Sequence, residues 1–169
     1  GQTGSVAEDA SVGDAVMTVS ITDSTPTAIL FTAGNADGIF AIATSGAVTI
    51  ADTTNLDFET MASYTLTIVA YDASSSDVAD ITISITNAND APTLATAQAD
   101  ETATEDTAYS VDVSGNFADA DVGDTLTYTA TGMPSTMTMS TAGVLSGTPL
   151  NADVGTSTVV VTATDGSSA

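Results

Sequence analysis

The chain contains the stretch Ile81-Thr82-Ile83-Ser84-Ile85-Thr86, in which every second residue is isoleucine and every residue between them is Thr or Ser. A similar alternation runs through Tyr64-Thr65-Leu66-Thr67-Ile68-Val69-Ala70. Successive side chains of a β-strand point to opposite faces, so a period of two places the apolar residues on one face and the hydroxyls on the other. Both stretches are therefore predicted to be half-buried strands.

Shorter segments of the same kind recur along the chain, separated by turn clusters such as Ala33-Gly34-Asn35-Ala36-Asp37-Gly38. No long segment shows the period of a helix. Short strands at this spacing indicate a β-sandwich rather than a parallel sheet. The further strands predicted are residues 15–21, 28–32, 39–42, 47–50, 109–113, 126–130 and 157–164.

A strand pattern stops at Asn87-Ala88-Asn89-Asp90-Ala91-Pro92, where a proline fixes the exit direction of the chain. A weak internal repeat flanks this point: Val69-Ala70-Tyr71-Asp72 is echoed by Val161-Thr162-Ala163-Thr164-Asp165. A chain of 169 residues can form two domains of roughly 80 to 90 residues, each able to bury its own core. We therefore expect an all-β fold of two tandem β-sandwiches, residues 1–91 and 92–169.

The charge of the chain excludes several classes of partner. There are 22 Asp and Glu residues and no Lys, Arg or His, which gives a net charge of −22. Nucleic acids and anionic membrane surfaces are held by Lys and Arg, so neither is expected to bind. No apolar run approaches the roughly 20 residues that span a bilayer, so membrane insertion is not expected either. Any neutralising cation has to come from outside the chain.

The residues needed for most enzyme chemistry are absent. Without His, Cys, Lys or Arg the chain cannot form a catalytic triad, a Schiff base, a thiolate or a cationic phosphate clamp. Asp57 and Glu59 could form a glycosidase pair, but no Trp is present to line a sugar-binding cleft. We therefore expect no catalytic activity, and we interpret Tyr64 and Tyr128, which lie in alternating strands, as core residues.

Several short motifs resemble those of known families. The motifs of the first half are Val6-Ala7-Glu8, Gly34-Asn35, Gly38-Ile39-Phe40-Ala41-Ile42, Gly46-Ala47-Val48, Leu56-Asp57-Phe58-Glu59, Ala70-Tyr71-Asp72 and Asn87-Ala88-Asn89-Asp90-Ala91-Pro92. Those of the second half are Phe117-Ala118-Asp119-Ala120-Asp121-Val122-Gly123-Asp124-Thr125-Leu126, Gly143-Val144-Leu145-Ser146-Gly147-Thr148-Pro149 and Thr164-Asp165-Gly166. The first half resembles a cadherin repeat. The second resembles the cadherin-like modules of bacterial surface proteins, which are of dystroglycan or immunoglobulin-like type. The resemblance implies two Greek-key sandwiches.

The resemblance also implies calcium between successive repeats. The ligands it implies are Glu8, Asp57 and Glu59 in the first unit, Asn87, Asn89 and Asp90 in the linker, and Asp119, Asp121 and Asp165 in the second unit. Calcium takes about six to eight oxygen ligands, and most of these side chains are carboxylates. Carboxylates gathered without a cation repel one another, so Ca²⁺ is expected to order the joint. Asn87 and Asn89 could instead be turn residues.

The chain departs from the family pattern at several positions. Asn87 stands where the family usually has Asp, and Ala91 stands where it usually has Asn. These departures could weaken or remove one calcium position. Upstream, Asp23 and Asp72 could contribute to an outer site, but Thr25 replaces the second Asp of the expected pair.

These features favour a structural role as a calcium-stiffened spacer in a bacterial cell-surface adhesin, extracellular filament or biofilm matrix. Its partners would be neighbouring repeats or identical subunits, joined end to end. Two alternatives stay open: a module that binds polysaccharide, a cell surface or a homologous repeat, and an accessory domain of a secreted hydrolase. The second unit has no predicted strand after residues 157–164, so we expect its closing strand to be supplied from beyond the chain, which would allow head-to-tail assembly.

Overall fold

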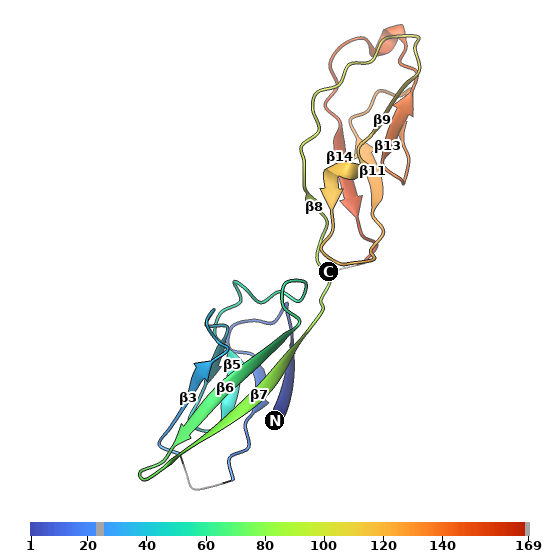
Figure 1. Ribbon diagram of the computed structural model, residues 1–169. Coiled ribbons are helices and arrows are strands. Elements are labelled where there is room, and N and C mark those ends of the chain that lie inside the picture. Colours follow the sequence, from blue (N-terminus) through green and yellow to red (C-terminus); the bar gives the residue numbers. More distant parts are fainter. Residues whose placement is uncertain (23–25, 168–169) are drawn as a thin grey trace. The chain divides into compact units, whose positions relative to one another are not determined.

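The computed structural model describes residues 1–22 and 26–167 and divides the chain into two units, Gly1–Ala88 and Asn89–Ala169 (Figure 1). The predicted boundary between residues 91 and 92 lies shortly after this division. Within the described residues the regular structure is β-strand, apart from two short 3-10 helices. None of the helices in this part of the chain has the length and apolarity to cross a membrane.

The first unit is a sandwich of two sheets. One sheet has the strand order β1-β7-β6-β3 and the other has the order β2-β5-β4. β1 runs parallel to β7, and the other neighbours are antiparallel. The strands are β1 Gln2–Ala7, β2 Ala15–Thr18, β3 Ala28–Ala33, β4 Phe40–Ile42, β5 Ala47–Ile50, β6 Ser63–Tyr71 and β7 Ser76–Thr86.

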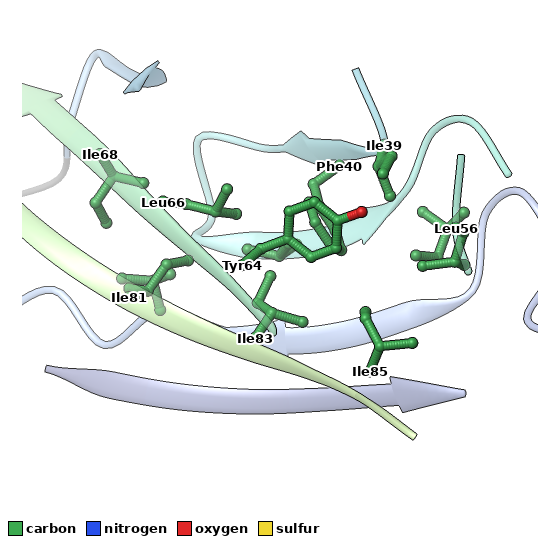
Figure 2. Packing of buried hydrophobic residues seen from close by; sticks show 12 residues of the cluster. Ile39, Phe40, Leu56, Tyr64, Leu66, Ile68, Ile81, Ile83 and Ile85 are labelled. Atoms are coloured by element: carbon green, nitrogen blue, oxygen red, sulfur yellow. The ribbon is translucent and has the colours of Figure 1, made fainter. Parts of the chain in front are cut away.

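The alternating residues of β6 and β7 form the core of this unit. Leu66, Ile81 and Ile83 are completely buried, and Figure 2 shows them gathered with Phe40 and Tyr64 between the strands. The rings of Phe40 and Tyr64 meet edge to face, with centroids 5.3 Å apart. Burying one such isoleucine contributes about 1.5–3 kcal/mol. The predicted core role of Tyr64 is confirmed.

The second unit contains three small sheets, with strand orders β10-β8, β11-β14 and β12-β13-β9. Tyr128 is buried, packs edge to face on Phe117, and donates a hydrogen bond to the Ser114 carbonyl. It is therefore a core residue, as predicted. The elements are β8 Thr93–Leu94, β9 Tyr109–Asp112, η1 Ser114–Asn116, β10 Phe117–Ala118, β11 Thr127–Thr131, β12 Met137–Met139, β13 Val144–Gly147, η2 Asn151–Asp153 and β14 Val160–Thr164.

The predicted strands are all present, with shifted ends. The strand predicted over residues 15–21 stops at Thr18, after a register shift between Ala15 and Met17. The strand predicted over 157–164 begins only at Val160. The strands β8, β10, β12 and β13 were not predicted; β8 and β10 have only two residues, which are too few to show a period of two.

Candidate metal centres

Three carboxylates of the first unit converge at the end of the sandwich where β7 stops. Glu8, Asp57 and Glu59 each offer an oxygen within 4.8 Å of the others. Glu8 directly follows β1, and its N–H is bonded to the carbonyl of Thr86, the last residue of β7. The parallel pairing of β1 with β7 therefore fixes Glu8 beside the chain that leaves the unit.

Backbone donors hold the carboxylate of Glu8 in place. Its two oxygens accept the N–H of Phe58, at 2.6 Å, and that of Ala88, at 2.7 Å. The bond to Phe58 draws the loop that carries Asp57 and Glu59 against Glu8, while buried Leu56 anchors that loop in the core. Glu8 thus connects the acidic loop to the segment that follows β7.

Asp57 is oriented by a turn of its own. Its carboxylate accepts the backbone N–H and the hydroxyl of Thr60, at 2.8 and 2.9 Å. These hydrogen bonds lower the pKa of Asp57, because they stabilise its ionised form. The turn therefore favours the charged carboxylate that a cation would bind.

A second carboxylate cluster lies in the second unit and consists of Asp119, Asp124 and Asp165. Each offers an oxygen within 4.8 Å of the others. Asp119 and Asp124 lie on one loop, between β10 and β11, and Asp165 directly follows β14. The antiparallel pairing of β11 with β14, in which Thr127 faces Thr164, brings the two segments together.

The first residues of the second unit are bonded to the same loops. Asn89 donates its side-chain amide to Asp165 at 2.9 Å, and the N–H of Asp90 donates to the Asp121 carboxylate at 2.7 Å. Asp121 is only 8% exposed, and its own N–H donates to Asp119 at 3.0 Å. Carboxylates from two loops thereby surround the backbone that enters the unit.

The electrostatics of the second cluster favour a bound cation. One oxygen of Asp119 is buried and has no hydrogen-bond partner within the described residues. Burial, together with the nearby charges of Asp121, Asp119 and Asp165, raises the pKa of Asp124. The Asn89 amide and the Ser167 N–H instead lower the pKa of Asp165. An unpartnered buried oxygen beside mutually repelling carboxylates fits the all-oxygen coordination of calcium, so the residues present suit that ion.

The structure brings together most of the predicted ligands, each within its own unit. Glu8, Asp57 and Glu59 form one cluster, and Asp119 and Asp165 belong to the other. Asn89, Asp90 and Asp121 adjoin the second cluster through the hydrogen bonds described above, and Asn87 follows β7 as an exposed residue. Of the upstream candidates, Asp23 and Thr25 lie outside the described residues, while Asp72 holds a turn between β6 and β7.

Asp124 was not predicted as a ligand. The available signal was Asp119-Ala120-Asp121-Val122-Gly123-Asp124, which has three carboxylates in one short loop with Gly123 at φ +110°. A glycine in this conformation turns the loop sharply, so Asp124 can point back toward Asp119.

Comparison with known protein families finds one match for each half of the chain. The "Cadherin domain" family model matches residues 2–86, and the "Putative Ig domain" model matches residues 91–169. No curated protein sequence matches the chain.

Several solved cadherin structures share the fold. EC1-2 of human protocadherin-24 is 18% identical with a TM-score of 0.64, and the match covers 95% of this chain and 89% of that one. Mouse cadherin-23 EC22-24 is 25% identical with a TM-score of 0.62, over 98% of this chain and 57% of that one. Protocadherin gamma B2 extracellular domains 3-6 are 21% identical with a TM-score of 0.63, over 96% of this chain and 44% of that one.

The chain thus spans about half the length of the last two structures. The matched ranges confirm the family resemblance that the sequence motifs indicated. The chain belongs to the cadherin family, with a cadherin domain in its first half followed by an immunoglobulin-like domain in its second.

Proposed function

We propose that this chain is a calcium-binding structural segment of an extracellular bacterial fibre, filament or adhesin stalk, joined end to end to neighbouring repeats or identical subunits. The fold is that of a cadherin extracellular repeat, which supports an adhesive or structural role outside the cell. Calcium at Glu8, Asp57 and Glu59, and at Asp119, Asp124 and Asp165, would stiffen the segment between the two domains.

The observation that carries this proposal is that each carboxylate cluster is tied to that connecting segment. Glu8 accepts the N–H of Ala88, while Asp165 and Asp121 accept donors from Asn89 and Asp90. These three consecutive residues are therefore tied, one after another, to metal-ligand candidates. A cation that orders the carboxylates would also restrict the backbone bonded to them.

The physical role of calcium follows from the charge of the chain. With 22 acidic and no basic residues, every gathered carboxylate raises the electrostatic free energy, and no internal cation offsets it. A divalent ion replaces that repulsion with attraction at both clusters. Linker rigidity would then depend on the calcium concentration outside the cell.

Thermal melting with calcium or with chelator tests calcium binding. Millimolar calcium should raise the melting temperature by about 5 °C or more relative to chelator, because an ion that binds only the native state stabilises it by mass action. Magnesium should substitute poorly, since it requires a smaller octahedral site and releases its water reluctantly. Identical melting curves in calcium and chelator would rule out the proposed sites.

Matched variants separate a specific site from general charge screening. Asp119→Asn removes a cluster carboxylate, whereas Asp100→Asn removes the same charge from an exposed residue outside both clusters. The calcium-dependent stabilisation should fall in the first variant and persist in the second. Small-angle scattering of the parent should show a narrower range of conformations in calcium than in chelator. An equal range of conformations in calcium and in chelator would contradict the stiffening role, but it would not contradict calcium binding.

An apolar row on the outer face of the first unit favours a second candidate function, recognition of another macromolecule. Leu30 of β3 pairs with Val69 of β6, which in turn pairs with Val78 of β7. Leu30 and Val78 are 53% and 59% exposed. The same face also carries the hydroxyls of Ser63, Thr65 and Ser84 and the carboxylate of Asp80.

Sedimentation equilibrium in calcium tests the homophilic form of this candidate. Association should weaken in a Leu30→Thr, Val78→Thr double variant if copies of the chain meet through the row. A monomer at every concentration would exclude that form.

A further inference from the structure

Strand β14 of the second unit is the structural equivalent of β6 in the first. Gly34 follows β3, has φ +84°, and would overlap the Thr65 carbonyl oxygen if it carried a Cβ. Gly132 follows β11, has φ +77°, and would overlap the Thr158 carbonyl in the same way. Asp72 lies seven positions after Thr65, and Asp165 lies seven positions after Thr158. The pair β11 and β14 therefore repeats the pair β3 and β6, except that the register shift between Phe31 and Ala33 has no counterpart in β11.

The two equivalent strands differ in what lies on their far edge. β6 pairs with β3 on one side and with β7 on the other. β14 pairs with β11 on one side, and no strand of the described part of the second unit pairs with its other side. The backbone groups along that edge of β14 are a template for a further strand.

The core of the second unit is also less covered. Among the described residues, only three buried hydrophobic side chains belong to this unit, Val113, Tyr128 and Met137. In the first unit, β7 contributes Ile81, Ile83 and Ile85, which are 0%, 0% and 3% exposed. Within the described residues no strand covers β14 in this way, and Val159 and Val161 are only half-buried, whereas the matching Leu66 and Ile68 are 0% and 4% exposed. A strand with the chemistry of β7 would supply the apolar surface that this core lacks.

The turn after β14 contains the same hydrogen bond as the turn after β6, in which an Asp carboxylate accepts the N–H of the residue two positions later. Asp72 accepts the N–H of Ser74 at 2.7 Å, and β7 then runs back along β6. Asp165 accepts the N–H of Ser167, also at 2.7 Å, and Gly166 between them has φ +85°. The backbone is thus already turning at residues 165–167, as it does at the start of the β6–β7 hairpin.

We propose that the free edge of β14 binds an antiparallel β-strand with β-branched apolar residues at alternate positions, supplied by the polypeptide that continues around the turn from Ser167. In the register of the first unit, Leu66 faces Ile81 and Tyr64 faces Ile83. The equivalent register places apolar residues of the new strand opposite Val159 and Ser157. This inference rests on the proposed end-to-end continuation of the chain and names the surface that receives it.

The test appends a copy of residues 77–86 after Ala169 of the full chain, because Ala169 corresponds to Ser76 in this alignment. A matched control carries the same copy with its three isoleucines replaced by threonine. Amide hydrogen exchange at residues 160–164 should slow by about tenfold or more with the isoleucine copy, and much less with the control. Amides of residues 81–85 report in each sample that the first unit is folded.

Three outcomes would overturn the proposal. Residues 160–164 could already exchange as slowly as residues 81–85 in the unmodified chain, or the two appended strands could protect them equally. Protection of the unmodified chain that rises with its concentration would instead identify a second copy as the strand donor. Calcium titration of the same samples distinguishes this question from the proposed function, because both carboxylate clusters are formed without the appended strand.

Discussion

Asp124 is the residue whose own environment most disfavours its charge. Partial desolvation and three neighbouring carboxylates raise its pKa, and a bound cation would offset both effects by favouring the charged form. We predict that Asp124→Asn weakens calcium binding roughly tenfold, because one charged ligand is lost while the loop keeps its shape. Calorimetric titration measures this loss, with Asp100→Asn as the charge-matched control. An unchanged affinity would mean that Asp124 lies outside the coordination shell.

Asp72 holds the turn between β6 and β7 through its carboxylate. Its carboxylate accepts the N–H groups of Ser74 and Ser75, which lowers its pKa to about 2. A folded-state pKa below the unfolded value stabilises the native state above about pH 4, and this contribution is lost as the pH falls toward 2. Asp72→Asn should therefore be less stable than the parent at pH 6, with the gap closing by pH 2. Urea denaturation at both pH values measures it, and a constant gap would contradict the assigned cause.

Sequence reasoning found most of the clustered carboxylates through the motifs that surround them, and it missed Asp124. Asp57 and Glu59 are two residues apart on one loop, so their role could be inferred from the Leu-Asp-Phe-Glu motif. Asp124 meets Asp165 only because β11 pairs with β14, a contact between residues far apart in the sequence. The loop motif Asp119-Ala120-Asp121-Val122-Gly123-Asp124 indicates a group of carboxylates, but it does not show that Asp124 meets Asp165.

At the level of elements, the alternating strands were predictable because their period matches a face of the sheet. β6 and β7 bury Leu66, Ile68, Ile81 and Ile83, as their alternation requires. Their ends were less certain, since strands stop where pairing stops. β14 begins at Val160 although the apolar pattern starts earlier, because Thr131, the last residue of β11, pairs with Val160.

The glycines after β3 and β11, Gly34 and Gly132, are positions where the fold should not tolerate a side chain. Gly34→Ala would bring a Cβ into the Thr65 carbonyl and force a left-handed conformation on alanine. We predict a loss of stability greater than the roughly 1–2 kcal/mol of the conformational penalty alone. Gly13→Ala is the matched control, since Gly13 also has positive φ but open space at its Cβ. Equal losses in the two variants, measured by denaturant unfolding, would show that the close approach to β6 costs nothing.

At the level of the whole molecule, the two units differ in how much core each one buries. Fourteen of the buried hydrophobic side chains in the described residues belong to the first unit, and three belong to the second. Hydrophobic burial is the main favourable term in folding, so the second unit has less to offset its chain entropy. The high negative charge affects both units and cannot account for a difference between them.

We therefore predict that the chain unfolds in two steps on heating, with the second unit melting first. The absence of Trp leaves NMR as the direct probe, since amide signals can be assigned to each unit separately. Signals of residues 160–164 should disappear at a lower temperature than those of residues 81–85, because β14 is paired on one edge and β7 lies between β1 and β6. Ile83→Val, which trims the buried core of the first unit, should lower the upper transition while leaving the lower one in place. Coincident loss of both sets of signals, with a single calorimetric transition, would show that the two units unfold as one cooperative body despite their unequal cores.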